Sequence, residues 1–277
     1  MPAENWTEGE YLTRGHKLAY VRTGAKLPPL ILLHGFTEDS STWFELAASL
    51  ETAYDLIMPD MLGHGNSDRL TPGADIDLEQ DLTDLITGLG LQKLALLGHS
   101  LGALTAAQFA AAHPELVACL ILEDIPWFEP TALPAIPQDA YSAANPAVIA
   151  RLAAGSRAQA LAYCAEHFPR WNENARRAWA ESKLRFDLEW YQRAPQKPTD
   201  WREISAKFNF PTLLVSGENK LGSMISSGFA LTALKCIPRL EWARIPGAGH
   251  YVHYDAPVPF LSNVKTFLRM QYSPKKG

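Results

Sequence analysis

The segment Gly98-His99-Ser100-Leu101-Gly102 constrains the fold of this chain more than any other part of its sequence. An apolar run at residues 94–97 precedes it, and an alanine-rich stretch at residues 103–112 follows it. Glycine and serine are common in ordinary turns, so the five residues alone are a weak signal. A strand before them and a helix after them predict a sharp turn that leaves the Ser100 hydroxyl free above a sheet. We therefore predict that Ser100 is a nucleophile.

Short apolar runs alternate with stretches of helical periodicity through most of the chain. Such runs are typical of strands that are covered on both faces, and their alternation with helices predicts parallel strands joined by right-handed crossovers. The predicted strands are two short ones within 11–24 that turn near Arg14-Gly15, and then 30–33, 54–58, 94–97, 118–122, 212–215 and 240–245. The predicted helices are 41–50, capped by Ser40 or Ser41, and then 77–89, 103–112 and 258–270.

This alternation stops after Asp124. From Pro126 to about Phe208 the buried-strand signal is missing, and eight prolines divide the stretch into short helices and loops. We predict a core domain at 1–125 and 209–277, with a helical cap inserted at 126–208. An insertion after the carboxyl end of a strand covers the crevice where open α/β sheets bind ligands. Trp127, in this stretch, is a candidate substrate contact; packing of the insert onto the core is the alternative for its tryptophans.

Charge and cysteine content exclude several classes of function. The net charge is −5 and no basic stripe is visible, which argues against a nucleic-acid partner. No apolar run has the ~18 residues that a membrane span needs. Cys119, Cys164 and Cys236 are isolated, so a zinc site or redox pair is not expected, and each is predicted to be a buried thiol. The polar N-terminus does not resemble a signal peptide, and we expect a cytoplasmic protein.

A serine nucleophile needs a general base. Pro246-Gly247-Ala248-Gly249-His250 follows the last predicted strand, and its glycines allow a tight turn that brings His250 towards Ser100. The other histidines lie in turns or helices where solvation or packing explains them. His253 lies past the glycine turn, and His99 is expected to pack under the serine turn.

The developing oxyanion needs two backbone N–H donors. One is expected from Leu101, the residue after the nucleophile. The turn Leu33-His34-Gly35-Phe36 ends an earlier strand and supplies the second, the N–H of Phe36. A simple strand-ending turn is the alternative interpretation of His34-Gly35.

The residues offer more than one carboxylate as the acid that orients the histidine. The common position, after the strand at 213–215, reads Gly217-Glu218-Asn219-Lys220, with lysine where an aspartate would stand. One strand earlier, Glu123 and Asp124 end the strand beside the serine turn. Because side chains alternate along a strand, at most one of these two faces the histidine. We favour Asp124, with Glu218 and Glu123 as alternatives.

These residues resemble the α/β-hydrolase superfamily over nearly the whole chain. The resemblance rests on His34-Gly35-Phe36, Asp60-Met61-Leu62-Gly63-His64-Gly65-Asn66-Ser67, the Ser100 motif and the Gly-x-Gly-His turn at His250. It implies an α/β-hydrolase fold, with a mostly parallel eight-stranded sheet flanked by helices and a cap after strand six. The segment from Asp60 to Ser67 is similar to a structural turn of the family.

Within the superfamily, haloalkane dehalogenases and zearalenone lactonases include members that carry their acid after the sixth strand. The 24 residues between Ser100 and Asp124 are similar to the spacing in those groups, although this chain has aspartate where such members use glutamate. Dehalogenases and epoxide hydrolases use an aspartate nucleophile, so a serine argues against both. The remaining resemblance is to capped serine esterases and lactonases.

The sequence thus predicts a serine hydrolase that cleaves carboxylic ester or lactone bonds of a medium-sized apolar substrate. Catalysis would use Ser100, His250 and Asp124, with the N–H groups of Phe36 and Leu101 as the oxyanion hole. No metal or organic cofactor and no membrane partner is expected, and the sequence carries no signal for an oligomeric state. The alternatives are a C–C bond or amide hydrolase with the same triad, and a slow-turnover ligand receptor of the same fold.

Overall fold

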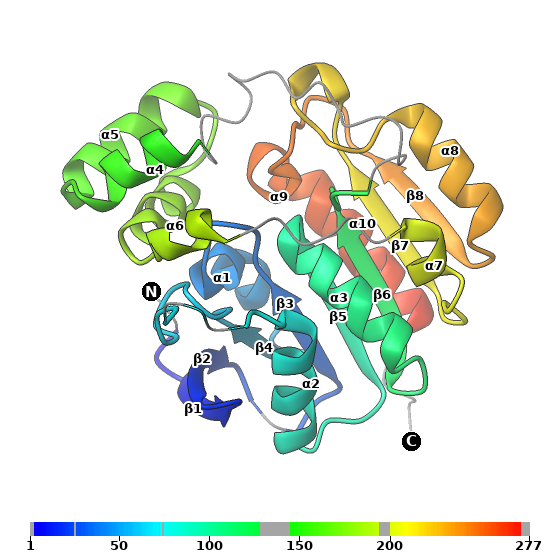
Figure 1. The fold of residues 1–277 in the computed structure, drawn as a ribbon. Coiled ribbons are helices and arrows are strands. Elements are labelled where there is room, and N and C mark those ends of the chain that lie inside the picture. The colour runs from blue at the N-terminus through cyan, green and yellow to red at the C-terminus, as the bar shows by residue number, and fades with distance from the viewer. Residues whose placement is uncertain are drawn as a thin grey trace.

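An eight-stranded sheet forms the centre of the molecule (Figure 1). The computed structural model describes residues 3–24, 26–71, 73, 75–127, 145–193 and 200–272. The strand order is β1-β2-β4-β3-β5-β6-β7-β8, and only the β1–β2 and β2–β4 pairs are antiparallel. The predicted mostly parallel eight-stranded sheet is confirmed. The strands are β1 (Thr7–Thr13), β2 (His16–Arg22), β3 (Pro29–Leu33), β4 (Asp55–Pro59), β5 (Leu94–His99), β6 (Val117–Glu123), β7 (Thr212–Ser216) and β8 (Leu240–Arg244).

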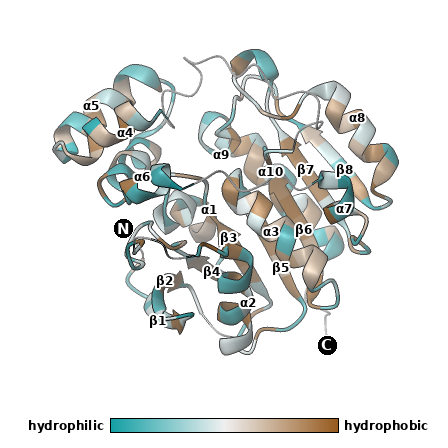
Figure 2. Cartoon of the chain, in the orientation of Figure 1, coloured by the Kyte–Doolittle hydropathy of each residue, from teal (hydrophilic) through white to brown (hydrophobic). Residues whose placement is uncertain are grey.

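Helices cover both faces of this sheet. One apolar cluster joins Ile31 and Leu33 of β3 to residues of α2, α3, α7 and α8, and a second joins Leu30 and Leu32 to residues of α1 and α10. Alternate residues of one strand therefore enter opposite clusters, as a doubly covered strand requires. Figure 2 shows the central strands as apolar. The α-helices are α1 (Phe44–Ala48), α2 (Leu78–Gly88), α3 (Leu101–Ala112), α4 (Pro146–Ala153), α5 (Arg157–His167), α6 (Glu173–Leu184), α7 (Trp201–Ser205), α8 (Ser227–Cys236), α9 (Val252–Asp255) and α10 (Pro257–Gln271).

The described part of the stretch between β6 and β7 contains α4, α5, α6, the 3-10 helix η3 (Leu188–Gln192) and α7. Figure 1 shows α4, α5 and α6 grouped beside the sheet, whereas α7 lies among the helices that cover it. Trp201 and Ile204 of α7 belong to the same apolar cluster as α3. Residues 128–144 and 194–199 of the predicted cap lie outside the described residues. The division into a core and a cap at 126–208 remains a prediction.

Two local expectations were wrong. A helical stretch lies where one was expected at 41–50, as the 3-10 helix η1 (Ser40–Trp43) followed by α1, but its cap is Asp39 and not Ser40 or Ser41: the Asp39 side chain accepts a hydrogen bond from the Ser41 N–H. Cys119 and Cys164 are buried as expected, but Cys236, in the last turn of α8, is exposed. Among the described helices, none is both long and apolar enough to cross a bilayer.

Candidate active site

Ser100 occupies a strained turn between β5 and α3. Its φ of 50° and ψ of −114° lie outside the regions that a non-glycine residue ordinarily adopts. The flanking glycines allow the backbone to make the close contacts that this turn requires. A Cβ on Gly98 would lie 2.3 Å from the carbonyl oxygen of Gly102, and one on Gly102 would lie 2.3 Å from that of Leu33. The turn therefore requires small residues on both sides and rests against the end of β3.

His250 and Asp124 meet in the structure although 126 residues separate them. His250 Nδ1 lies 2.7 Å from Asp124 Oδ2, and the Asp124 side chain is fully buried while that of His250 is 11% exposed. Asp124 directly follows β6 with a φ of 43°, and its N–H donates to the carbonyl oxygen of Val215 in the neighbouring β7. A carboxylate on Nδ1 is the arrangement that would leave Nε2 of His250 to act as a base.

The Asp124 carboxylate also accepts hydrogen bonds from the segment after β7. The Ser223 hydroxyl donates to Oδ1 over 2.5 Å, the Met224 N–H donates to Oδ2 over 2.8 Å, and the Ile225 N–H donates to Oδ1 over 3.3 Å. With His250, four donors face one carboxylate, which is the number of acceptor sites that an ionised carboxylate offers. Sequence reasoning missed Ser223. The sequence signal that could have found Ser223 was Lys220 at the usual acid position. A segment after β7 that does not supply the acid can instead donate hydrogen bonds to an acid from the neighbouring strand.

The two alternative acids have other partners. Glu123 points away from His250, and its Oε1 lies 2.8 Å from both the backbone N and Nδ1 of His253. Glu123 is the last residue of β6, whereas Asp124 follows the strand with a positive φ, so the two side chains leave the backbone in different directions. Glu218 forms ion pairs with Arg244 at 3.1 Å and with Lys220 at 3.3 Å. Lys220 itself is exposed, so the residue at the usual acid position points into solvent.

The two expected oxyanion donors come from neighbouring elements. Leu101 is the first residue of α3, and a helix leaves its first N–H groups without an acceptor inside the helix. Phe36 lies in the turn after β3, and the close approach of Gly102 to the carbonyl oxygens of Leu33 and His34 brings that turn beside the start of α3. The positive end of the α3 dipole then also faces the space above Ser100.

Aromatic side chains from the inserted stretch pack on the Phe36 ring. The ring centroids of Phe186, Trp190 and Tyr191 lie 5.1, 5.8 and 5.6 Å from that of Phe36, all at edge-to-face angles. Trp127 lies elsewhere: it is 3% exposed and stacks near Trp201, at a centroid distance of 5.9 Å, inside the core cluster. Its position favours packing, and its role as a substrate contact stays a prediction.

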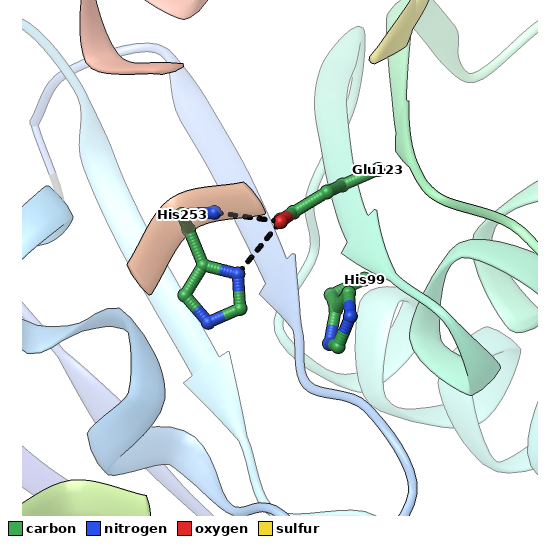
Figure 3. Close-up of side chains that lie close together, drawn as sticks. All are labelled: His99, Glu123 and His253. Atoms are coloured by element: carbon green, nitrogen blue, oxygen red, sulfur yellow. Dashed lines mark hydrogen bonds and ion pairs between the residues drawn. The ribbon is translucent and has the colours of Figure 1, made fainter. Parts of the chain in front are cut away.

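A buried layer of charged side chains lies under the serine turn. Figure 3 shows three of them, His99, Glu123 and His253, with both hydrogen bonds of Glu123 directed at His253. Burial alone would lower the pKa of the His253 imidazole, but the charge and hydrogen bond of Glu123 raise it above its usual value. Burial would raise the pKa of the Glu38 carboxyl, yet His99, His253 and Lys183 hold it well below its usual range.

The ligand-type atoms of His99, Glu123 and His253 lie within 4.8 Å of one another, a spacing that a metal ion could use. Their orientation favours a hydrogen-bonded charge network instead. His99 Nδ1 lies 2.8 Å from Glu38 Oε2, and its Nε2 lies 3.1 Å from the carbonyl oxygen of His250. Both ring nitrogens of His99 therefore face oxygen atoms of this network. His99 thus lies under the turn as expected, and it also forms two polar contacts that the sequence did not indicate.

Comparisons with known proteins agree with this fold. The profile of the family described as alpha/beta hydrolase fold matches residues 28–257. The chain is 28% identical over 265 residues to the 2-(acetamidomethylene)succinate hydrolase of Mesorhizobium japonicum, an alignment that covers 90% of each protein. An uncharacterized protein of Mycobacterium tuberculosis is 38% identical over 111 residues, but the chain spans only about a third of its length: the alignment covers 39% of this chain and 32% of that protein.

Among solved structures, the esterase RhEst1 of Rhodococcus sp. ECU1013 superposes with a TM-score of 0.76 and 24% identity, covering 96% of this chain and 99% of that one. At this identity the likeness establishes the fold alone.

Proposed function

The chain belongs to the α/β-hydrolase family, which supports a hydrolase activity, and we propose that it is a serine hydrolase that cleaves carboxylic ester or lactone bonds through an acyl-enzyme. The observation that carries the proposal is the contact of His250 with Asp124 at the end of the strand next to Ser100, which itself lies in a strained turn. A strained nucleophile beside an oriented imidazole is the arrangement that acyl transfer needs.

In the proposed reaction, Ser100 Oγ attacks the carbonyl carbon while His250 Nε2 takes the hydroxyl proton. Asp124 holds the imidazole in the required tautomer and stabilises the imidazolium that forms. The N–H groups of Phe36 and Leu101 donate to the tetrahedral oxyanion. His250 then gives its proton to the leaving oxygen, and a water activated by the same imidazole releases the acyl group.

The proposed substrate is a medium-sized, largely apolar ester or lactone, bound beneath a helical cap. The edge-to-face packing of Phe186, Trp190 and Tyr191 on Phe36 supports this, because it places an aromatic surface next to the residue proposed to donate to the oxyanion. Esters and lactones present the same electrophilic carbonyl, so the triad does not separate them.

The test is turnover of a panel of p-nitrophenyl esters, lactones and anilides by the wild type, Ser100→Ala and Ser262→Ala. Ser262 is an exposed serine of α10 and serves as the matched control. We expect multiple turnover by the wild type and Ser262→Ala, and a loss on the order of 10⁴–10⁶ in kcat for Ser100→Ala. Unchanged turnover in Ser100→Ala would refute the proposal.

Amide cleavage by the same triad is the second candidate. It is favoured by the Mesorhizobium japonicum relative, whose substrate name contains an acetamido group. Faster turnover of anilides than of matched esters would select this candidate. A single slow burst that leaves a lasting adduct on Ser100 would instead indicate a ligand receptor of the same fold, and cleavage of a β-diketone would indicate C–C bond hydrolysis.

A further inference from the structure

Glu38 connects the turn that carries Phe36 to the serine turn. Its Oε2 accepts hydrogen bonds from the Gly35 N–H and from His99 Nδ1, both over 2.8 Å. Both side chains are buried, with exposed fractions of 0% for Glu38 and 1% for His99. His99 is the residue immediately before Ser100. One carboxylate oxygen of Glu38 therefore holds together two of the three segments of the proposed site, which are the turn at Gly35, the turn at Ser100 and the loop of His250.

His99 extends this connection to the third segment. Its Nε2 lies 3.1 Å from the carbonyl oxygen of His250. A carbonyl oxygen and an ionised carboxylate can only accept, so a proton on each nitrogen of the His99 ring would satisfy both contacts. In that state the ring is an imidazolium with Glu38 as its counter-ion.

We propose that the buried Glu38–His99 ion pair is a positioning element that holds the oxyanion turn at Gly35, the serine turn at Ser100 and the loop of His250 in register. The inference rests on the proposed function of Ser100 and His250. Neither Glu38 nor His99 touches the reacting atoms, and both act through the backbone of the residues that do.

The packing around the pair explains why it can set positions. A Cβ on Gly35 would lie 2.5 Å from His99 Nδ1 and 2.6 Å from Glu38 Oε2, so the turn closes directly onto the pair. Burying an ion pair is costly, and apolar side chains of the same volume often stabilise a fold as well or better. Directional bonds to the backbone of Gly35 and of His250, from a pair that includes the residue next to Ser100, are something that apolar packing cannot supply.

The charge around the pair is consistent with this role. Lys183 is fully buried and its Nζ donates to the carbonyl oxygen of Thr37, the neighbour of Glu38. His253 Nε2 lies 3.9 Å from Glu38 Oε1, and Glu123 holds the other side of the His253 ring. Glu38 thus has cationic groups around it and remains ionised, as the bond from His99 requires.

The protonation of His99 is tested by NMR of ¹⁵N-histidine-labelled protein at neutral pH, in the wild type and in Ser100→Ala. The His99 signals are identified by their loss in His99→Gln. We expect two ring N–H protons on His99 in both proteins. A single protonated nitrogen on His99 would overturn the inference, and the result does not depend on turnover.

Kinetics of Glu38→Gln and His99→Gln test the positioning role. Each variant should lower kcat on the order of 10²-fold with little change in KM, because a small displacement of catalytic groups affects the transition state more than binding. The double variant should lose no more than the worse single variant, since the two residues act as a unit.

Asp81→Asn is the matched control. Asp81 is also buried and pairs with a histidine, His16 Nε2, at 3.0 Å, but it lies on α2, outside the three catalytic segments. It should lower the melting temperature as Glu38→Gln does while kcat stays unchanged. Equal kcat in Glu38→Gln and wild type would overturn the positioning role, whereas full turnover by Ser100→Ala would overturn only the proposed function.

Discussion

At the scale of single residues, side chains that are adjacent in the sequence contact different partners at the site. Asp124 contacts His250, and the adjacent Glu123 contacts His253. Ser100 is the proposed nucleophile, and the adjacent His99 bridges two other segments. In each pair, the last residue of a strand points into the buried layer, and the next residue, which follows the strand with a positive φ, lies at the site. Two histidine–carboxylate pairs therefore lie close together with separate partners.

The assignment of the acid leads to a direct comparison of two variants. Asp124→Asn should lower kcat on the order of 10⁴-fold, because an amide cannot hold the tautomer of His250 or stabilise its imidazolium. Glu218→Gln should leave kcat unchanged, since Glu218 pairs with Arg244 and Lys220. Steady-state hydrolysis of one p-nitrophenyl ester measures both. A large loss in Glu218→Gln with Asp124→Asn still active would reverse the assignment.

Ser223 also contacts the Asp124 carboxylate, and its substitution should lower kcat less than substitution of Asp124 itself. Ser223→Ala removes one hydrogen bond to Oδ1 of Asp124 and leaves the Met224 and Ile225 donors in place. We expect a loss of about 10-fold in kcat, which corresponds to about 1.4 kcal/mol, with KM little changed. Ser223→Thr keeps a hydroxyl and should retain more activity. The prediction fails if both variants match the wild type.

At the scale of elements, the end of α6 reaches the turn after β3. Lys183 Nζ donates to the Thr37 carbonyl oxygen over 2.8 Å and lies 4.5 Å from the centre of the Trp179 ring. Arg185, the residue after α6, donates to Asp39 Oδ2 over 2.6 and 2.9 Å. Thr37 has a φ of 65°, which is unfavourable for a β-branched residue. The end of α6 therefore stabilises the conformation of the turn that is proposed to supply an oxyanion donor.

Lys183 gives this contact a pH dependence. Burial lowers the pKa of the Lys183 ammonium to about 8, despite the opposing charges of Glu38 and Asp39. Between pH 8 and the ordinary lysine value the unfolded chain binds more protons than the folded one, so folding becomes more favourable as pH rises. Relative to Lys183→Met, the wild type should gain about 1–2 kcal/mol in free energy of unfolding from pH 7 to 9.5.

Urea denaturation of the two proteins at both pH values measures that difference. The comparison with Lys183→Met removes the titration of other groups, which the two proteins share. A wild type whose stability falls against the variant over this interval would show that the folded state raises the pKa of the Lys183 ammonium, so that the charges of Glu38 and Asp39 outweigh burial.

At the scale of the whole molecule, the sheet with its two apolar clusters supports every catalytic segment. The serine turn, Asp124 and the oxyanion turn follow the carboxyl ends of β5, β6 and β3, which are neighbours in the sheet. Ligand sites of open α/β sheets lie at that edge. The stretch between β6 and β7 contributes to both regions: α6 reaches the oxyanion turn, and α7 packs with α3 over the sheet.

A substitution at Trp201 tests whether α7 is part of the hydrophobic core. Although it lies inside the predicted cap, it is 1% exposed and packs on Phe229 at a centroid distance of 5.0 Å. Trp201→Ala should reduce the free energy of unfolding by about 3–5 kcal/mol, as large-to-small changes in a core do. Leu188→Ala, at a partly exposed leucine of η3, should cost under about 1 kcal/mol. Equal costs in thermal unfolding would place α7 outside the core.

The sequence by itself determined the sheet, the serine turn and the position of His250, because each depends on local patterns. Apolar runs specify buried strands, and glycines beside Ser100 and His250 permit tight turns. The same reasoning favoured Asp124 as the acid and left Glu123 and Glu218 as alternatives. It placed His99 under the serine turn without its partners, and Glu38 and Lys183 gave no sign of their burial, because polar residues are expected at the surface unless partners are known.

Only the tertiary structure decided which carboxylate each histidine binds. Those partners lie 99 to 130 residues apart in the sequence, as for Asp124 with Ser223 and His250, or Glu123 with His253. A buried charge is tolerated only where the fold brings a complementary group within hydrogen-bond distance, and no local pattern encodes that distance. The proposed nucleophile is therefore predicted from five consecutive residues, whereas the arrangement that orients its proposed partners exists only once the strands are side by side.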